Sequence, residues 1–436
     1  MPEYMVAVEQ LRIGVFISLD HLKWFEHPFL FSSFKITKPD QLMTLRELGI
    51  SSVTCIPEKS DVLPLPIKQG SPPIQTPAMT ILPQTESAQT RKLWEVKKER
   101  IERLRQRRVK DDKCEKQFQK SVAEVKHVMQ DIETGSREAF EESDRMMQTI
   151  VASLMPEKES AIQLMNTKFG KENVFYHSLN VSVLSMMLGR EYGLDADMIR
   201  ILGLGALFHD IGKSRIPKNI LHKATALSRA EMKFYQLHPR YGADILTKLD
   251  VVPDYAIKAV YQHHERIDGR GFPEFLSGNK ISLFARIVSI VNVYDNHCNK
   301  YNPQDSLTPH EALAYMFGVQ KNQFDQDLLA LFIQCLGVYP PGTIVKLTNG
   351  FIAMVISVNP RTPLYPSVMI YNPQIPKKEA LICDLVDEPT LKIESSIKPS
   401  HLPQEVYEYL SPRTRVTYYV TDTETQQGQA GNTTVS

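Results

Sequence analysis

Cysteine is scarce in this sequence of 436 residues, and long apolar runs are lacking. The five cysteines are scattered and form no CxxC pair, which argues against a disulfide framework and against a zinc site built on cysteine. No apolar run approaches the ~18 residues of a membrane-spanning helix, and the first residues lack the basic and apolar regions of a signal peptide. We therefore expect a protein of the reducing cytoplasm with no membrane span.

An excess of charge of one sign is also missing. The chain has 51 Lys and Arg against 50 Asp and Glu, a formal net charge of +1, so we expect no binding to a nucleic-acid polymer. Residues 91–113 hold eleven basic and five acidic side chains, but interleaved charges of this kind are more typical of a solvated helix face. The 42% of apolar residues is enough for a globular core.

The sequence pattern predicts a mainly α protein with a small N-terminal α/β domain and a small C-terminal β module. Seven prolines between positions 57 and 83 indicate a linker. The predicted segments are an N-terminal α/β regulatory domain at 1–60, the Pro-rich linker at 61–87, a long helix with a helical connector at 88–169, a helical domain at 170–336, the β module at 337–400, and a partly disordered tail at 401–436.

Local signals refine this division. Ser228 and Thr308 each begin a capping box, a sign of a helix start, and residues 136–335 are expected to be wholly helical. Asn349-Gly350 is a strong two-residue turn signal and predicts a hairpin.

The long helix is expected to begin near Ala88. Apolar residues recur at a/d heptad spacing in its second half, which is typical of a helix-packing seam, whereas charged residues such as Lys97 interrupt the first half.

Histidine is concentrated in the predicted helical domain at 170–336, with eight of the twelve between His177 and His310. Imidazole binds divalent first-row metals, and carboxylates can bridge two of them. His209-Asp210 ends an apolar helix, and burying ionisable groups there is costly unless they are paired or bound to metal. An ordinary core or surface role is preferred for three other histidines, His222, His297 and His310.

Two motifs resemble those of the HD-GYP family, bacterial HD-superfamily phosphodiesterases that act on cyclic di-GMP. They are HDIGK at 209–213 and HHERIDGRGFP at 263–273, in which Phe272 stands where the family signature has tyrosine. The resemblance covers about residues 170–336 and implies an HD-type helical bundle. The first ~130 residues resemble a domain of unknown function that often precedes HD-GYP.

By position, the resemblance implies seven metal ligands and two divalent ions. One ion would be held by His177, His209, Asp210 and Asp295, and the other by Asp210, His238, His263 and His264, with Asp210 bridging. Nitrogen and oxygen ligands without thiolate suit iron or manganese, although ligand softness does not separate these metals from zinc.

The chemistry expected of such a centre is hydrolysis of a phosphodiester. Two metals ~3.5–4 Å apart lower the pKa of a shared water and offset charge on the phosphate. The predicted catalytic residues are Asp210 and Lys213, with the lysine contacting the scissile phosphate. The alternative for Lys213 is a cation that completes the dipole of a helix C-terminus.

The resemblance implies that the loop after the double histidine lines the substrate site, and its glycines would let the backbone approach a ligand closely. The alternative is a tight turn that only holds the histidines, and for Arg286 a structural ion pair is equally open. The predicted substrate contacts are Arg266, Asp268, Gly269, Gly271, Arg286 and Lys300.

Two departures from the family pattern qualify these expectations. Some members have a glutamate that helps to bind a third metal where this chain has Asn173, so we expect two ions. Asn173 also suits an N-cap. The basic segment that follows the metal aspartate in the family is largely replaced at 299–304, with Lys300 the only cation.

The leading expectation is a metal-dependent phosphodiesterase that hydrolyses cyclic di-GMP to pGpG and on to GMP in bacterial second-messenger signalling. The main alternative is a weakly active or inactive sensor that keeps the metal centre, and a third is a hydrolase of mononucleotides. Protein partners at the N-terminal region or the long helix, and a homodimer, stay open.

Overall fold

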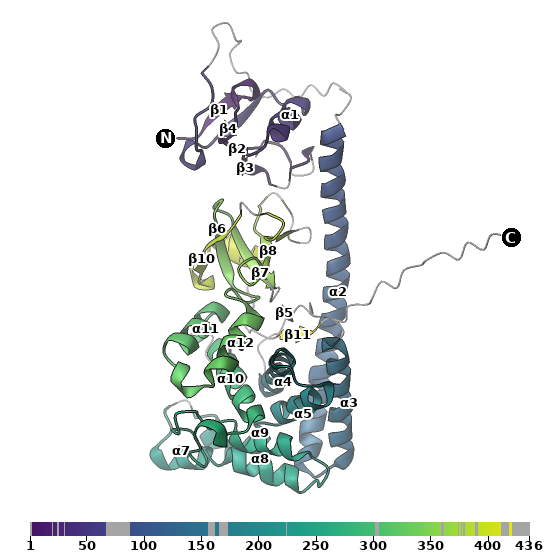
Figure 1. Ribbon diagram of the computed structural model, residues 1–436, viewed down its shortest axis with the longest axis vertical. Coiled ribbons are helices and arrows are strands. Elements are labelled where there is room, and N and C mark those ends of the chain that lie inside the picture. The colour runs from purple at the N-terminus through teal and green to yellow at the C-terminus, as the bar shows by residue number, and fades with distance from the viewer. Residues whose placement is uncertain are drawn as a thin grey trace, which may run out of the picture. The chain divides into compact units, whose positions relative to one another are not determined.

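The computed structural model describes residues 2–19, 21–23, 26–29, 31–66, 88–155, 162–164, 173–223, 225–300, 305–358, 362–373, 375, 377, 380–388, 391–410 and 418–420 (Figure 1). The chain divides into two units. Unit 1 comprises Met1–Val109, Thr348–Phe351 and Tyr371–Leu381, and unit 2 comprises the remainder.

Unit 1 is built on a four-stranded antiparallel sheet. Its strand order is β1 (Tyr4–Ala7), β4 (Ser52–Cys55), β2 (Phe16–Ser18) and β3 (Ser33–Lys35). Helix α1 (Pro39–Glu47) begins with proline, a residue that suits the first helical position, and packs on the sheet through Leu45. Short 3₁₀ turns follow β1 at Val8–Gln10 and β4 at Pro57–Lys59.

The first part of the long helix α2 (Ala88–Glu133) belongs to unit 1 and carries a buried lysine. Lys97 is only 4% exposed, and its Nζ donates to the backbone oxygens of His27 at 2.6 Å and Phe29 at 3.2 Å. Burial lowers the pKa of Lys97 to about 7. The residue that interrupts the heptad pattern is thus an internal hydrogen-bond donor.

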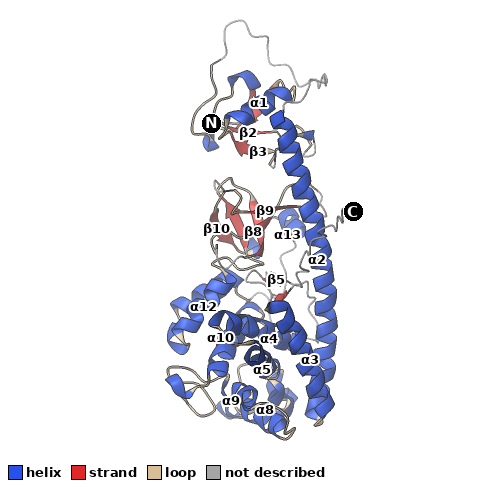
Figure 2. Ribbon diagram, turned by 45° about the vertical axis from the view of Figure 1, so that its right-hand side comes forward, coloured by secondary structure: helices blue, strands red, loops and turns tan. Residues whose placement is uncertain are grey.

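Unit 2 is dominated by helices (Figure 2). They pack through apolar faces: on α4, for example, Leu179, Val183 and Met187 recur every four residues and are at most 3% exposed. Besides the end of α2, its helices and 3₁₀ turns are α3 (Arg137–Leu154), α4 (Asn173–Tyr192), α5 (Ala196–Leu207), η4 (Ile211–Arg215), α6 (Lys218–Leu221), α7 (Arg229–Tyr235), α8 (His238–Thr247), α9 (Asp254–Gln262), η5 (Gly278–Lys280), α10 (Leu283–Cys298), α11 (Pro309–Gly318), η7 (Lys321–Gln323), α12 (Gln326–Leu336), η9 (Pro399–His401) and α13 (Gln404–Leu410).

Predicted helix starts and the predicted hairpin agree with the structure. The capping boxes of Ser228 and Thr308 are both formed, at α7 and α11. The hairpin joins β6 (Ile344–Leu347) to β7 (Ile352–Ser357), with Gly350 at a φ of 88° in the turn. These strands belong to a five-stranded sheet of order β10 (Ile393–Ile397), β6, β7, β8 (Ser367–Ile370) and β9 (Leu381–Asp384).

The expectation that residues 136–335 are wholly helical is wrong. Strand β5 (Ile162–Leu164) lies in that range and pairs antiparallel with β11 (Tyr418–Val420) of the C-terminal tail. Strands of three residues are too short to show a period of two in a sequence. Most of the predicted linker, at 67–87, and the tail segments 411–417 and 421–436 lie outside the described residues.

The predicted fold class is confirmed: mainly α, with a small N-terminal α/β part and a small C-terminal sheet. Among the described residues, no helix combines the length and the apolar character needed to cross a membrane.

Replacing Lys97 by methionine tests the buried amine through the pH dependence of unfolding. The pKa of Lys97 is about 7 in the folded unit and 10.5 in an unfolded chain, so between these values only the unfolded chain holds the proton. The free energy of unfolding should therefore rise with pH across this window, and this rise should be absent in Lys97→Met. Both tryptophans, Trp24 and Trp94, belong to unit 1, so tryptophan fluorescence reports its unfolding.

His27 supplies an internal control for that experiment. Burial lowers the pKa of His27 from 6.5 to about 3, so both proteins should lose stability as the pH falls through this lower window. A rise above pH 7 that persists in the variant would contradict the role assigned to Lys97.

Candidate metal centre

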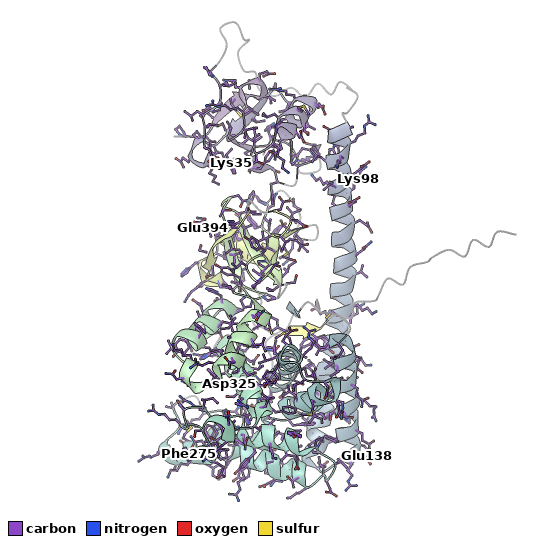
Figure 3. All side chains as sticks on the ribbon, in the orientation of Figure 1. Lys35, Lys98, Glu138, Phe275, Asp325 and Glu394 are labelled. Atoms are coloured by element: carbon purple, nitrogen blue, oxygen red, sulfur yellow. The ribbon has the colours of Figure 1, made fainter. Side chains whose placement is uncertain are left out.

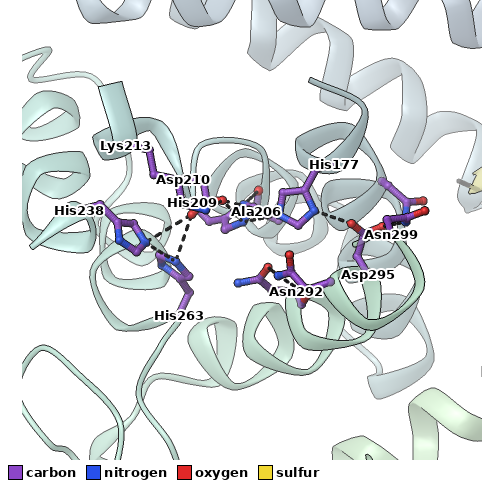
Figure 4. A network of polar contacts seen from close by, with 12 residues as sticks. His177, Ala206, His209, Asp210, Lys213, His238, His263, Asn292, Asp295 and Asn299 are labelled. Carbon is purple, nitrogen blue, oxygen red and sulfur yellow. Dashed lines mark hydrogen bonds and ion pairs between the residues drawn. The ribbon is translucent and has the colours of Figure 1, made fainter. Parts of the chain in front are cut away.

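Asp210 lies at the centre of a cluster of imidazoles, and each of its carboxylate oxygens faces a different pair (Figure 4). Oδ2 lies 3.4 Å from Nε2 of His209 and 3.6 Å from Nε2 of His177. Oδ1 lies 3.4 Å from Nε2 of His238 and 3.7 Å from Nε2 of His263. One carboxylate therefore joins two groups of nitrogen donors.

The structure brings six of the seven predicted ligands into two groups whose donor atoms lie within 4.8 Å of one another. The groups are His177, His209 and Asp210, and Asp210, His238, His263 and His264.

Backbone carbonyls fix the tautomer of three of these histidines. In each, Nδ1 lies 2.7 to 2.8 Å from the carbonyl oxygen three residues earlier, near the end of α5, α7 or α9, where such oxygens lack a helical partner. A carbonyl oxygen can only accept a hydrogen bond, so Nδ1 holds the proton and Nε2 presents a lone pair. The histidines are His209, His238 and His263, and their acceptors are Ala206, Tyr235 and Val260.

His177 reaches the same state by a different contact. This residue comes from α4, and its Nδ1 lies 2.5 Å from Oδ2 of Asp295 on α10, so the carboxylate accepts the Nδ1 proton. Its Nε2 then faces Nε2 of His209 at 3.2 Å, and on the other side of Asp210 the Nε2 atoms of His238 and His263 lie 3.4 Å apart. Lone pairs at these distances repel unless a cation lies between them.

The charges of the cluster suit such a cation. Burial lowers the pKa values of His209 and His238, that of His263 to about 4, and that of His264 well below its usual value, so these imidazoles are neutral near pH 7. Neutral imidazole is the form that binds a metal. Among the described residues, Oδ1 of Asp210 and Nε2 of His264 are buried without a hydrogen-bond partner. The donor set therefore fits divalent metal ions.

Lys213 adds a cation at the edge of the cluster. Its Nζ lies 2.5 Å from Oδ2 of Asp210, and its side chain is 29% exposed. Burial acts to lower the pKa of Lys213, but Asp210 raises it overall. Burial likewise acts to raise the pKa of Asp210, but Lys213 and the neighbouring His209 hold it well below its usual range.

Asp295 belongs to neither group of donor atoms, although the sequence predicts it as a ligand. Its Oδ2 accepts a hydrogen bond from Nδ1 of His177. Asp295 thus occupies the position that the carboxylate has in a carboxylate–histidine–metal triad. Its Oδ1 accepts from Nδ2 of Asn180 and, at 2.8 Å, from Nδ2 of Asn299. No motif predicts these two amides; the available signal is an asparagine three residues after His177 in an apolar helix.

The loop after the double histidine is folded back onto it. The ring of Phe272 stacks on His264 with centroids 4.5 Å apart. A Cβ at Gly271 would lie 2.5 Å from the backbone oxygen of His264, so only glycine fits there. Gly269, with a φ of 72°, makes the turn.

A buried carboxylate holds the far side of this loop. Glu265 is 2% exposed and accepts the backbone N–H groups of Glu274 at 2.6 Å and Leu276 at 2.9 Å. Burial raises the pKa of the Glu265 carboxyl. Phe275, which lies between Glu274 and Leu276 and is labelled in Figure 3, has a side chain that is 68% exposed. Glu265 directly follows the two histidines in the motif, and this position is the signal from which a role at the site could have been predicted.

The predicted substrate contacts have different surroundings. Arg266 pairs with Asp268 at 2.8 Å within the loop. Arg286 instead forms an ion pair with Asp325 at 2.6 Å, which is the structural role that the sequence leaves open for it. Lys300 has an exposed side chain, and its backbone N–H donates to Ser306. The side chain of Asn173 and residues 301–304 lie outside the described residues.

Gly212 in the HDIGK motif lets two ligand-bearing segments meet. A Cβ at this position would lie 2.0 Å from the backbone oxygen of His238 and 2.4 Å from the backbone nitrogen of Gly242, at the start and the middle of α8. The absence of a side chain thus allows η4, which follows Asp210, to pack directly on the helix that begins with His238.

Family models match three regions of the chain. An HD domain matches residues 149–328, a domain of unknown function (DUF3391) matches residues 4–143, and a KOW domain associated with HD domains matches residues 344–405.

Curated relatives carry related names. A cyclic di-GMP phosphodiesterase of Pseudomonas aeruginosa is 28% identical over 367 residues, 84% of each chain. A cyclic di-GMP phosphodiesterase response regulator of Xanthomonas campestris is 33% identical over 147 residues, 33% of this chain and 39% of that protein. A 3′3′-cGAMP-specific phosphodiesterase of Vibrio cholerae is 39% identical over 145 residues, 33% of both chains.

Gly212→Ala should disturb the centre, because the added methyl group meets backbone rather than a movable side chain. We expect a loss of ~1–3 kcal/mol or more in the free energy of unfolding, the scale of overpacking, together with a lower metal content. Urea unfolding followed by circular dichroism and metal analysis measure the two effects.

Gly318→Ala is the matched control for that variant. Gly318 is the last residue of α11, and a Cβ there meets nothing within 4 Å. Its stability should change by less than ~1 kcal/mol. If the two variants behaved alike, the close packing at Gly212 would not be the cause.

Proposed function

Since this chain belongs to the HD domain family and has HD-type phosphodiesterase relatives, we propose that it is a metal-dependent cyclic di-GMP phosphodiesterase. One observation carries the proposal: the lone pairs of neutral imidazoles converge with the two oxygens of a single buried carboxylate, Asp210, in two groups of donor atoms. An arrangement of this kind suits a pair of divalent ions that share one ligand. We propose two ions, iron or manganese, because the donors are nitrogen and oxygen without thiolate.

The residues of the chain have defined tasks in this proposal. His177 and His209 would hold one ion and His238, His263 and His264 the other, and Asp210 would serve both. Asp295 acts on the first ion with His177, as ligand or through the Nδ1 proton it accepts.

Ions bound there supply Lewis acidity, which makes a hydroxide available near neutral pH and offsets charge on the phosphate. In the reaction, an oxygen of water would bond to phosphorus, the bond to the ribose 3′ oxygen would break, and a proton of that water would end on the 3′ oxygen. The ring opens to pGpG, and a second hydrolysis gives GMP.

We propose that Lys213 contacts the scissile phosphate. Its side chain is partly exposed while the ammonium pairs with Asp210, which leaves room for it to contact both the carboxylate and an incoming phosphate. The backbone of the loop at Gly269 and Gly271, with Arg266 and Asp268, would line the substrate site, and Lys300 would supply a further charge. For Arg286 we favour the structural role, because its guanidinium already forms an ion pair with Asp325.

The base preference is a separate proposal. Relatives named for cyclic di-GMP and for 3′3′-cGAMP both match this chain, so the two dinucleotides deserve to be compared. A sensor without turnover is the remaining alternative, supported by the altered segment at 299–304. Regulation through the N-terminal region and α2, a homodimer and a cytoplasmic location stay predictions.

The experiment that tests the function combines metal analysis with product analysis. Protein purified without oxygen is assayed for bound metals and is then incubated with each dinucleotide, and the products are separated by chromatography. The double variant His209→Ala, Asp210→Ala should lose turnover and most of its metal while it keeps its helical circular dichroism, because Asp210 serves both ions. Full metal content and full hydrolysis in this variant would show that the centre is assigned wrongly.

Lys213→Ala should slow hydrolysis by ~10²–10³-fold, the usual scale for loss of one transition-state contact, with metal content unchanged. Lys218→Ala is the control, since Lys218 is an exposed lysine of the nearby helix α6. A normal rate with a lower melting temperature in Lys213→Ala would instead support the helix-terminus role.

A further inference from the structure

We propose that the C-terminal strand β11 is part of the metal centre, where it positions Asp295 through Asn180. The backbone N–H of Tyr418 donates to Oδ1 of Asn180 at 2.7 Å. Nδ2 of Asn180 donates to Oδ1 of Asp295, whose other oxygen accepts the Nδ1 proton of His177. This inference rests on the proposed function, because His177 belongs to the proposed metal site.

The direction of the first hydrogen bond decides what Asn180 can do. A backbone N–H is a donor only, so it selects the oxygen end of the Asn180 amide. The nitrogen end must then face Asp295, where a donor meets a carboxylate. Without the N–H of Tyr418 the amide could turn over and set its oxygen against Asp295, which would repel it. The strand therefore determines which end of the amide Asp295 meets.

Burial makes this orientation consequential. Asn180 and Asp295 are each 1% exposed, and Tyr418 is fully buried. A lost hydrogen bond at such a depth is costly, because solvent does not readily replace the missing partner. Asn299 also donates to Oδ1 of Asp295, but it is only half-buried.

Side chains around β11 fix the strand in place. The hydroxyl of Tyr418 lies 3.2 Å from the backbone oxygen of Pro341 and 2.9 Å from the hydroxyl of Tyr294, the neighbour of Asp295 in the chain. Tyr419 bonds through its hydroxyl to Ser121 of α2 at 2.9 Å. Strand β5 pairs with the backbone of β11. A segment far along the chain is thus tied to α2, α4 and α10 at the His177 side of the centre.

Asn180 is accordingly a positioning residue. It orients Asp295, which in turn orients His177, and it touches neither substrate nor the proposed ions. Loss of a residue that orients a metal ligand typically weakens metal binding ~10–100-fold. The loss should fall on the ion at the His177 side alone, since the hydrogen bonds of His238 and His263 run to the backbone of their own segments.

The test measures manganese binding to the full-length, metal-free protein by calorimetry. Asn180→Ala should weaken one of two binding events ~10–100-fold and leave the other unchanged. Alanine favours the helix, so α4 should stay folded. Asn299→Ala is the matched control: it removes a donor to the same oxygen at a place that water can reach, and it should have the smaller effect.

Variants at position 418 separate the backbone N–H from the side chain. Tyr418→Ala loses the ring but keeps the N–H, whereas Tyr418→Pro loses both, so the proline variant should bind the ion at the His177 side more weakly. Because Asn180→Ala and the loss of the N–H at position 418 break the same chain of hydrogen bonds, Tyr418→Pro should bind no more weakly than Tyr418→Ala when each is combined with Asn180→Ala. Additive losses would overturn the inference.

The outcomes distinguish this inference from the proposed function. An unmodified protein that binds no manganese contradicts the metal centre itself. An unmodified protein that binds two ions, with Asn180→Ala binding both equally well, contradicts only the role of β11. Should Tyr418→Pro not fold, as judged by circular dichroism, the comparison of Asn180→Ala with Asn299→Ala still decides the matter.

Discussion

The burial of one carboxylate, Asp210, is the constraint on which the arrangement of unit 2 depends. A buried charge needs compensation. Lys213 pairs with one oxygen of Asp210, and the imidazole nitrogens that face both oxygens can hold the cations that would supply the rest. Those imidazoles can offer lone pairs only if their other nitrogen is bonded elsewhere. The free carbonyls near the ends of α5, α7 and α9 meet that need. These helices end beside Asp210, and the carbonyl groups at their ends accept hydrogen bonds from the histidines of the site.

The two sides of Asp210 are supported differently. On the side of His238 and His263, each histidine is held by a carbonyl three residues earlier, so short segments of chain suffice. On the side of His177 the support passes through Asp295 and Asn180 to Tyr418, more than two hundred residues away in sequence. Any displacement of β11 would therefore act on one half of the centre, and Ser121 ties that strand to the long helix α2.

Sequence reasoning reached the elements whose signals are local. Capping boxes located α7 and α11, and the Asn-Gly turn located a hairpin. Two motifs located four of the six residues that converge in space, and the family resemblance supplied the other two, His177 and His238. Sequence reasoning failed where the partner is distant in the chain. Strands β5 and β11 are too short to show a period. The charge of Lys97 is typical of a solvated residue, whereas its buried amino group donates hydrogen bonds to two backbone carbonyls. The family resemblance likewise placed Asp295 at the centre without showing that its oxygens accept hydrogen bonds from His177 and two amides.

The loop after the double histidine shows why two of the alternatives weighed from the sequence are not exclusive. Gly271 and the ring of Phe272 press the loop onto His264, and Glu265 accepts two of its N–H groups. The segment is thus a tight turn that holds a histidine. Because these contacts come from the chain itself, the loop needs no ligand to take its shape. A backbone fixed in advance loses little entropy on binding, so the turn that secures His264 is also suited to receive the proposed substrate.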